Sequence, residues 1–139
     1  MENIRYIIES DYEDYLNLIS QLTTVGTVTK DNFSEFVKSQ NNSHRTLIWE
    51  IGGKAVACLT ILIEQKIAHS FSKVMHIEDV VVDQYHRGKK LSRKLVERAI
   101  EIGHEFGCYK VILNCSEYNI AFYQHLGFKK AENQMVWRY

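Results

Sequence analysis

Residues 76–91 read HIEDVVVDQYHRGKKL. Its apolar run is rich in valine, which is typical of a β-strand, and we expect a strand over residues 75–83. Glu78 and Asp79 stand at the start of the valines, and the loop after them carries a glycine and three cations, at Arg87, Gly88, Lys89 and Lys90. The strand therefore joins an acidic end to a basic end.

The residues after this loop have the pattern of an amphipathic helix. One apolar stripe runs through Leu91, Leu95, Ala99, Ile102 and Phe106, with charged residues between its members. We expect a helix over residues 91–106 and a second apolar strand over residues 109–115. A succession of strand, helix and strand favours parallel pairing through a right-handed crossover.

Shorter elements are predicted on both sides of this unit. Further strands are expected over residues 3–9, 45–51, 54–64 and 134–139, and further helices after a cap at Ser10 or Asp11, over residues 30–40 and over residues 120–126. Gly52 and Gly53 form the pair that a type I′ hairpin turn favours. The expected fold class is α/β (α+β mixed): a central mixed, mostly antiparallel sheet with a parallel βαβ unit and flanking helices.

Length and composition narrow the class of protein. The chain has 139 residues and no proline, and nothing marks a linker, so we expect one domain over residues 1–139. Seventeen basic residues balance seventeen acidic ones, so nucleic acid and membrane are not expected partners. No segment approaches the roughly 18 apolar residues of a membrane span, and the N-terminus does not resemble a signal peptide. A cytoplasmic protein is therefore expected.

Metal chemistry is not expected. Neither C-x-x-C pairs nor histidines at i, i+4 spacing occur, so the usual zinc patterns are missing from the sequence. The three cysteines, Cys58, Cys108 and Cys115, form an odd set, and two of them lie in apolar runs. Reduced, mostly buried thiols are favoured over a catalytic cysteine.

The loop between the valine strand and the helix is a candidate anion site. Unpaired backbone N–H groups and the positive end of the helix dipole meet at such a loop, and the cations Arg87, Lys89 and Lys90 surround it. A phosphate or pyrophosphate is the typical guest. The alternative is a solvated basic turn. The loop matches neither the P-loop pattern nor the G-x-G-x-x-G pattern of dinucleotide-binding folds.

Several blocks together carry a family resemblance. They read LTTVGTVT at 22–29, LIEQKIAHS at 62–70, IEDVVVDQYHRGKKLSRKL at 77–95, GCYKVILNC at 107–115, NIAFYQHLGF at 119–128 and MVWRY at 135–139. This succession resembles the GNAT superfamily of N-acetyltransferases and, within it, the enzymes that acetylate glucosamine 6-phosphate. The resemblance implies a homodimer that uses acetyl-CoA and transfers acetyl directly in a ternary complex. The product, N-acetylglucosamine 6-phosphate, would enter UDP-N-acetylglucosamine biosynthesis.

The resemblance implies where acetyl-CoA binds. Its pantetheine arm would run along the strand at 77–82 and its pyrophosphate would sit on the loop at 87–92. The implied contacts are Val80, Val81, Val82, Arg87, Gly88, Lys89, Lys90, Leu91, Ser92, Asn119, Phe122 and Tyr123. Many family members have glycine where this chain has Lys90 and Ser92. Tyr123 is the implied acid that protonates the leaving thiolate, and amides near Val80 would stabilise the oxyanion.

The amino sugar phosphate has its own implied set of residues: Thr23, Lys66, Ile67, Ala68, His69, Glu78, Asp79, Tyr109, Lys110 and Arg138. The cations suit a phosphate, and the carboxylates suit hydroxyls and an ammonium group. Side chains alternate along a strand, so Glu78 and Asp79 are expected on opposite faces. One of them would then act through the partner subunit.

Asn114 departs from the family pattern. Related enzymes carry Asp or Glu at this position, where the carboxylate is viewed as accepting the amine proton or orienting the amine, and an amide cannot take a proton. Water, a backbone carbonyl or Glu78 remain as candidate acceptors. The catalytic set implied is therefore Tyr123, Asn114 and Glu78. Because an amino sugar loses its proton near neutral pH, activity should rise toward alkaline pH.

Two other functions stay open from the residues. One is acetyl transfer to a polyamine, an aminoglycoside or a protein amine. The other is a non-catalytic acyl-CoA-binding module. The cations Lys66, His69, Lys110 and Arg138 favour an anionic acceptor over a polyamine.

Overall fold

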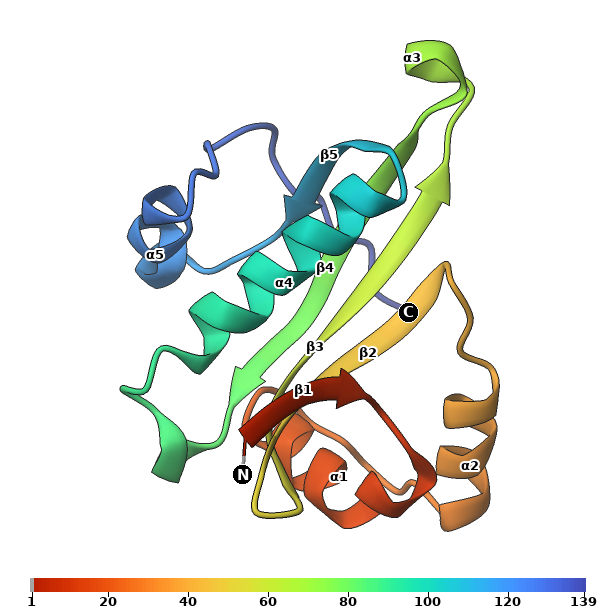
Figure 1. Cartoon of the computed structure of the whole chain (residues 1–139), viewed down its shortest axis with the longest axis vertical. Coiled ribbons are helices and arrows are strands. Elements are labelled where there is room, and N and C mark those ends of the chain that lie inside the picture. Colours follow the sequence, from red (N-terminus) through yellow and green to blue (C-terminus); the bar gives the residue numbers. More distant parts are fainter. Residues whose placement is uncertain (1) are drawn as a thin grey trace.

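A five-stranded mixed sheet forms the centre of the computed structural model, which describes residues 2–139 (Figure 1). Its strands lie in sequence order: β1 (Glu2–Tyr6), β2 (His44–Ile51), β3 (Lys54–Gln65), β4 (Lys73–Val82) and β5 (Cys108–Leu113). The pairs β1–β2, β2–β3 and β3–β4 are antiparallel, and β5 runs parallel to β4. The predicted fold class is therefore confirmed, with α4 (Leu91–Glu105) as the crossover between β4 and β5.

Helices cover both faces of the sheet. Figure 1 shows α4 lying across one face, over β3, β4 and β5. Helices α1 (Tyr12–Ser20) and α2 (Lys30–Lys38) lie at the bottom of the view, and α1 packs on β3 and β4 from the opposite face. The remaining helices are α3 (Ala68–Phe71) at the tip of the β3–β4 hairpin and α5 (Ile120–His125) after β5. Short 3₁₀ turns occupy η1 (Glu9–Asp11), η2 (Gln84–His86) and η3 (Glu117–Asn119).

Two apolar clusters, one on each face, hold these layers together. On the α4 face, Met75 and Ile77 of β4 pack with Leu95 and Ile102. On the α1 face, Leu18, Tyr15 and Phe33 pack with Ile48 and Cys58, which are fully buried on the sheet. The apolar stripe of α4 and the strands β2, β3 and β4 thus supply most of the buried residues. Strand β5, predicted as a continuous apolar run, contains no fully buried residue.

The turns follow the glycine pattern. Gly52 and Gly53 have φ values of 57° and 82°, so both adopt the left-handed conformation that a type I′ turn requires. At the start of α2, the Thr29 hydroxyl accepts from the Asn32 N–H at 3.1 Å, and the Asn32 side chain accepts from the Thr29 N–H. Both turn and cap are therefore readable from local sequence.

Two predicted strands differ from the structure. The first strand ends at Tyr6 rather than at residue 9, because η1 begins at Glu9. The predicted strand over residues 134–139 is wrong: that described segment has no regular structure, and Met135 and Trp137 are 90% and 83% exposed. An extended apolar segment becomes a strand only when another strand accepts its hydrogen bonds, and this one pairs with none of the strands described.

Candidate active site

The sheet opens between β4 and β5. These strands pair from Lys73↔Cys108 to Ile77↔Leu113, and beyond Ile77 β4 continues beside β3 alone. Within residues 2–139, the other edge of Val80–Val82 therefore has no strand partner. Unpaired N–H and C=O groups along a strand edge can hydrogen-bond an extended ligand in the manner of an added strand.

A β-bulge in β4 accompanies this opening. The register against β3 shifts between Cys58 and Thr60, and Asp79 has a φ of +50°. Ile77 belongs to the cluster on the α4 face, whereas Val81 belongs to the cluster on the α1 face, so the alternation inverts between them. The expectation that Glu78 and Asp79 face opposite sides rested on regular alternation, which does not hold here.

The Asp79 carboxylate lies close enough to the α1 face to act on Cys58. The pKa of the Cys58 thiol is raised well above its ordinary value. Burial is the larger cause, and the negative charge of Asp79 adds to it. This thiol also donates to the Asp79 carbonyl at 3.7 Å. A buried, protonated thiol is a poor nucleophile, so Cys58 fits the structural role expected for it.

The loop before α4 has the conformation of an anion site. Gly88 and Lys90 both have positive φ, at 84° and 61°, and α4 begins at Leu91 directly after them. No side chain among the described residues caps this helix, so its first N–H groups remain available. Lys90 adopts the left-handed conformation that glycine provides freely, at a cost of about 1 kcal/mol.

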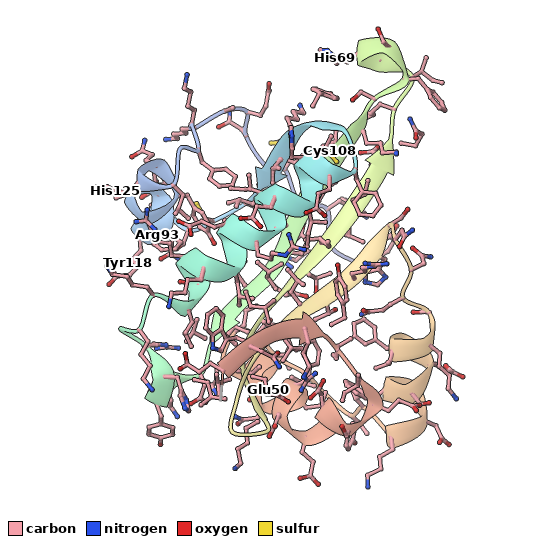
Figure 2. All side chains as sticks on the ribbon, viewed as in Figure 1. Glu50, His69, Arg93, Cys108, Tyr118 and His125 are labelled. Atoms are coloured by element: carbon pink, nitrogen blue, oxygen red, sulfur yellow. The ribbon has the colours of Figure 1, made fainter. Side chains whose placement is uncertain are left out.

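A groove of about 490 Å³ runs from the free edge of β4 to this loop. It brings together most of the residues expected to hold acetyl-CoA: Val80, Val81, Val82, Arg87, Gly88, Lys90, Leu91, Ser92, Asn119, Phe122 and Tyr123. Lys89 does not line it and is exposed. The groove also contains Gln21, Leu22, His86 and Tyr118, which sequence reasoning missed. Figure 2 shows Tyr118 beside α5, on the side of the molecule where α4 begins.

Tyr123 stands where the groove meets α5. The residue is 9% exposed, and its ring packs edge-on against Phe122 and Phe128. Burial, with a smaller contribution from Cys115, raises the pKa of its hydroxyl. The hydroxyl therefore stays protonated across the neutral range and can donate a proton or hydrogen bond.

A second hollow, of about 590 Å³, lies along the exposed edge of β5. It contains Glu78, Lys110 and Asn114 from the expected set, together with His76 and Lys129, which were not anticipated. Asn114 is the first residue after β5, so its side chain stands next to the opening of the sheet. Carboxylate, amide and ammonium groups in one hollow can orient a polar molecule that carries an anion.

The hairpin tip holds another part of the expected acceptor set. His69 stacks on Tyr109 with ring centroids 4.0 Å apart, and Ile67 beside it is 84% exposed. Ala68 begins α3 and His69, Ser70 and Phe71 all have positive φ, a strained turn for residues other than glycine. Figure 2 shows His69 at the far end of the hairpin.

Lys66, at the base of this tip, already forms an ion pair with Glu64. Its Nζ lies 2.9 Å from Glu64, whose other oxygen lies 3.0 Å from His76. The hydrogen bond that the Lys66 ammonium donates to Glu64 is the main cause of the lowered pKa of Glu64, and the same bond is the main cause of the raised pKa of Lys66. An anion that binds Lys66 has to compete with Glu64.

One chain does not bring all the expected acceptor residues together. Lys73, which pairs with Cys108 next to Tyr109, is five residues from Glu78, or about 16 Å along an extended strand. Thr23 follows α1 on the groove side, next to Leu22, and Arg138 lies in the exposed terminal segment. The hollow that holds Glu78, Lys110 and Asn114 is not lined by any residue of the hairpin tip.

Two kinds of feature are missing from the part of the chain that the structure describes. No three His, Cys, Asp or Glu side chains there are grouped so that they could hold a metal ion. None of the described helices combines the length and apolar character needed to cross a bilayer.

Known proteins share both the sequence and this arrangement. The family model described as "Acetyltransferase (GNAT) family" matches residues 5–128. The chain is 37% identical to glucosamine 6-phosphate N-acetyltransferase of Candida albicans over 94% of this chain and 91% of that protein. It is 38% identical to the protein of the same name from Arabidopsis thaliana, over 92% and 89%. A crystal structure of glucosamine-6-phosphate N-acetyltransferase from Arabidopsis thaliana superposes with a TM-score of 0.94 at 36% identity, covering 100% of this chain and 99% of that one.

Proposed function

Because this chain belongs to the acetyltransferase (GNAT) family, we propose that it is the enzyme that transfers the acetyl group of acetyl-CoA to the amine of glucosamine 6-phosphate. One observation carries the proposal: the free edge of β4 leads directly to the uncapped start of α4, so one groove offers strand hydrogen bonds and an anion site in line. That order matches the pantetheine arm and the pyrophosphate of acetyl-CoA.

The groove residues have distinct tasks in binding. Backbone groups of Val80–Val82 hydrogen-bond the amides of the pantetheine arm, as a neighbouring strand would. The N–H groups around Gly88 and Lys90, with the first turn of α4, hold the pyrophosphate, and Arg87 adds charge. Lys89 contributes charge from outside the groove.

Transfer is direct. The lone pair of the neutral sugar amine attacks the thioester carbonyl and forms the C–N bond, which places a negative charge on the carbonyl oxygen. The C=O bond then re-forms as the C–S bond breaks, and the electron pair leaves on sulfur. N–H groups near Val80 stabilise the negative oxygen, and the Tyr123 hydroxyl protonates the thiolate. Asn114 accepts a hydrogen bond from the amine and orients it, and Glu78 in the same hollow takes the amine proton.

The acceptor site is completed by a second copy of the chain. The hairpin tip, where His69 stacks on Tyr109 of β5, lies outside the hollow that contains Glu78 of the same chain. In a homodimer the tip of one subunit can approach the opening of the other. The apolar terminal segment, with Met135 and Trp137 exposed, supplies surface for that contact. Cytoplasmic location and a place in UDP-N-acetylglucosamine biosynthesis stay predictions.

An assay for the free CoA thiol that acetyl transfer releases tests the proposed function. Purified protein is incubated with acetyl-CoA and, in separate reactions, with glucosamine 6-phosphate, glucosamine, spermidine or no amine, and mass spectrometry identifies the product. Thiol release that depends on glucosamine 6-phosphate and matches its N-acetyl product supports the proposal. Faster release with spermidine indicates a different acceptor, and no release with any amine indicates a non-catalytic acyl-CoA-binding module.

A further inference from the structure

The loop between β4 and α4, residues 83–90, is called here the cofactor loop. The side chain of Gln21 ties it to the end of α1. Its amide Nε2 donates to Oδ1 of Asp83 at 2.9 Å, and its Oε1 accepts from the backbone N–H of Gln84 at 2.8 Å. Both partners directly follow β4, 62 and 63 residues further along the chain. Gln21 therefore bridges two segments that only the fold brings together.

Asp83 passes this contact on to the loop. Its Oδ2 accepts from the Tyr85 N–H at 3.1 Å and lies 3.0 Å from Nδ1 of His86, while its own N–H donates to the Val56 carbonyl at 2.8 Å. The side chain of Asp83 is only 13% exposed. The hydrogen bond from Gln21 is the largest cause of its lowered pKa, so the carboxylate is held ionised.

Gln21 also directly precedes Leu22 and Thr23, the latter a residue of the expected acceptor set. Leu22 lines the groove, and Thr23 follows it at the start of the loop that connects α1 to α2. The other end of this connection is also fixed, because the Tyr12 hydroxyl donates to the Val28 carbonyl at 2.5 Å. Gln21 thus joins the cofactor loop to the loop between α1 and α2, which contains Thr23.

We propose that Gln21 is a positioning residue that holds the cofactor loop in its anion-binding conformation through Asp83 and Gln84. The inference rests on the proposed function, because it concerns how the same groove binds CoA. Gln21 acts through the loop, in which Gly88 and Lys90 hold left-handed conformations immediately before α4. A loop that is already ordered does not lose conformational freedom when the ligand binds.

Loss of the bridge should weaken CoA binding by roughly tenfold. Gln21→Ala removes two hydrogen bonds, one of them to a carboxylate, and a loss of this kind corresponds to about a tenfold change in an equilibrium constant. Gln21→Glu keeps the acceptor for the Gln84 N–H but sets a second carboxylate against Asp83, so it should weaken binding at least as much.

A double variant exchanges donor and acceptor. In Gln21→Glu with Asp83→Asn, the new glutamate accepts from the Gln84 N–H and from the new asparagine amide, and the asparagine oxygen still accepts from the Tyr85 N–H. The pair keeps a single negative charge. It should therefore restore CoA affinity to within about threefold of the original protein.

Isothermal titration calorimetry with CoA and no acceptor is the test, with urea unfolding of each variant measured alongside. Asn17→Ala, an exposed amide on the same helix, is the matched control and should bind CoA normally. A tenfold loss in Gln21→Ala that the double variant reverses supports the inference. Unchanged affinity in Gln21→Ala, or a double variant as weak as the single variants, overturns it. If the original protein binds no CoA, the proposed function fails and the inference falls with it.

Discussion

Tyr123→Phe isolates the proposed proton donor. Phenylalanine keeps the aromatic ring, which packs against Phe122 and Phe128 with centroids 4.9 and 5.7 Å away. Only the hydroxyl oxygen is lost, so the free energy of unfolding should change by less than about 1 kcal/mol. Because burial raises the pKa of this hydroxyl, the native group is fully protonated at neutral pH and ready to donate.

The expected loss of rate is roughly 100-fold. General acid catalysis contributes about 10²–10⁴-fold, and a thiolate, with a parent thiol pKa near 8.5, needs less help to leave than an alkoxide, so the lower end applies. This loss corresponds to about 2.7 kcal/mol in the activation free energy. The KM for acetyl-CoA should stay within about threefold, because the hydroxyl acts on the leaving sulfur and not on the bound thioester.

Steady-state thiol release with saturating glucosamine 6-phosphate measures both constants. Tyr6→Phe is the matched control, since Tyr6 lies on β1 and its ring contacts Arg45 at 4.4 Å, a contact that phenylalanine preserves. The same loss of one hydroxyl there should leave kcat unchanged. A Tyr123→Phe enzyme that keeps its kcat would refute the assignment of Tyr123 as the acid.

Three further predictions concern the loop, the core and the pH profile. Lys90→Gly should be about 1 kcal/mol more stable in urea unfolding than Lys90→Ala, because both lose the ammonium and only alanine keeps a Cβ at a φ of 61°. Asp11→Ala should lower the free energy of unfolding by about 3 kcal/mol, because Asp11 is 3% exposed and receives two 2.8 Å hydrogen bonds from Arg5. Initial rates should rise from about pH 7 to about pH 9 as the sugar amine becomes neutral. Glu78→Gln should lower the rate about tenfold near pH 7, because it removes the proposed proton acceptor. Asn114→Asp should change the rate less than about twofold.

Each of these has a clear contrary result. Equal stability of the two Lys90 variants would mean that the left-handed conformation carries no cost at that position. An Asp11→Ala protein as stable as the original would show that its pair with Arg5 is not needed by the fold. For the pH profile, the raised pKa of Tyr123 keeps the acid protonated between pH 7 and about pH 9, so a flat or falling rate would contradict the proposed order of proton transfers.

Local patterns were enough to predict the sheet and its main helix. The valines of β4, the stripe that begins at Leu91 and the pair Gly52–Gly53 each report on neighbouring residues, and the structure confirms all three elements. The loop at Gly88 was also readable, because a strand that enters a helix through glycine and cations exposes amide groups wherever it occurs.

Features that depend on distant pairing were not readable. The bulge at Asp79 arises from the register between β3 and β4, and no local signal distinguishes it from a regular strand. Gln21 was missed for the same reason, since its partner Asp83 is brought to it by the fold. The terminal segment was predicted as a strand from its apolar residues, but strand formation needs a partner edge that lies elsewhere.

The ratio of kcat/KM for glucosamine 6-phosphate to that for glucosamine tests the central claim most directly. Both sugars offer the same amine, and only the first carries a phosphate, the group that the cations of the expected acceptor set suit, such as Lys110 in the hollow beside Glu78. Loss of a charge-assisted contact predicts a preference for the phosphorylated sugar of at least about 100-fold. Equal values for the two sugars would contradict glucosamine 6-phosphate as the acceptor.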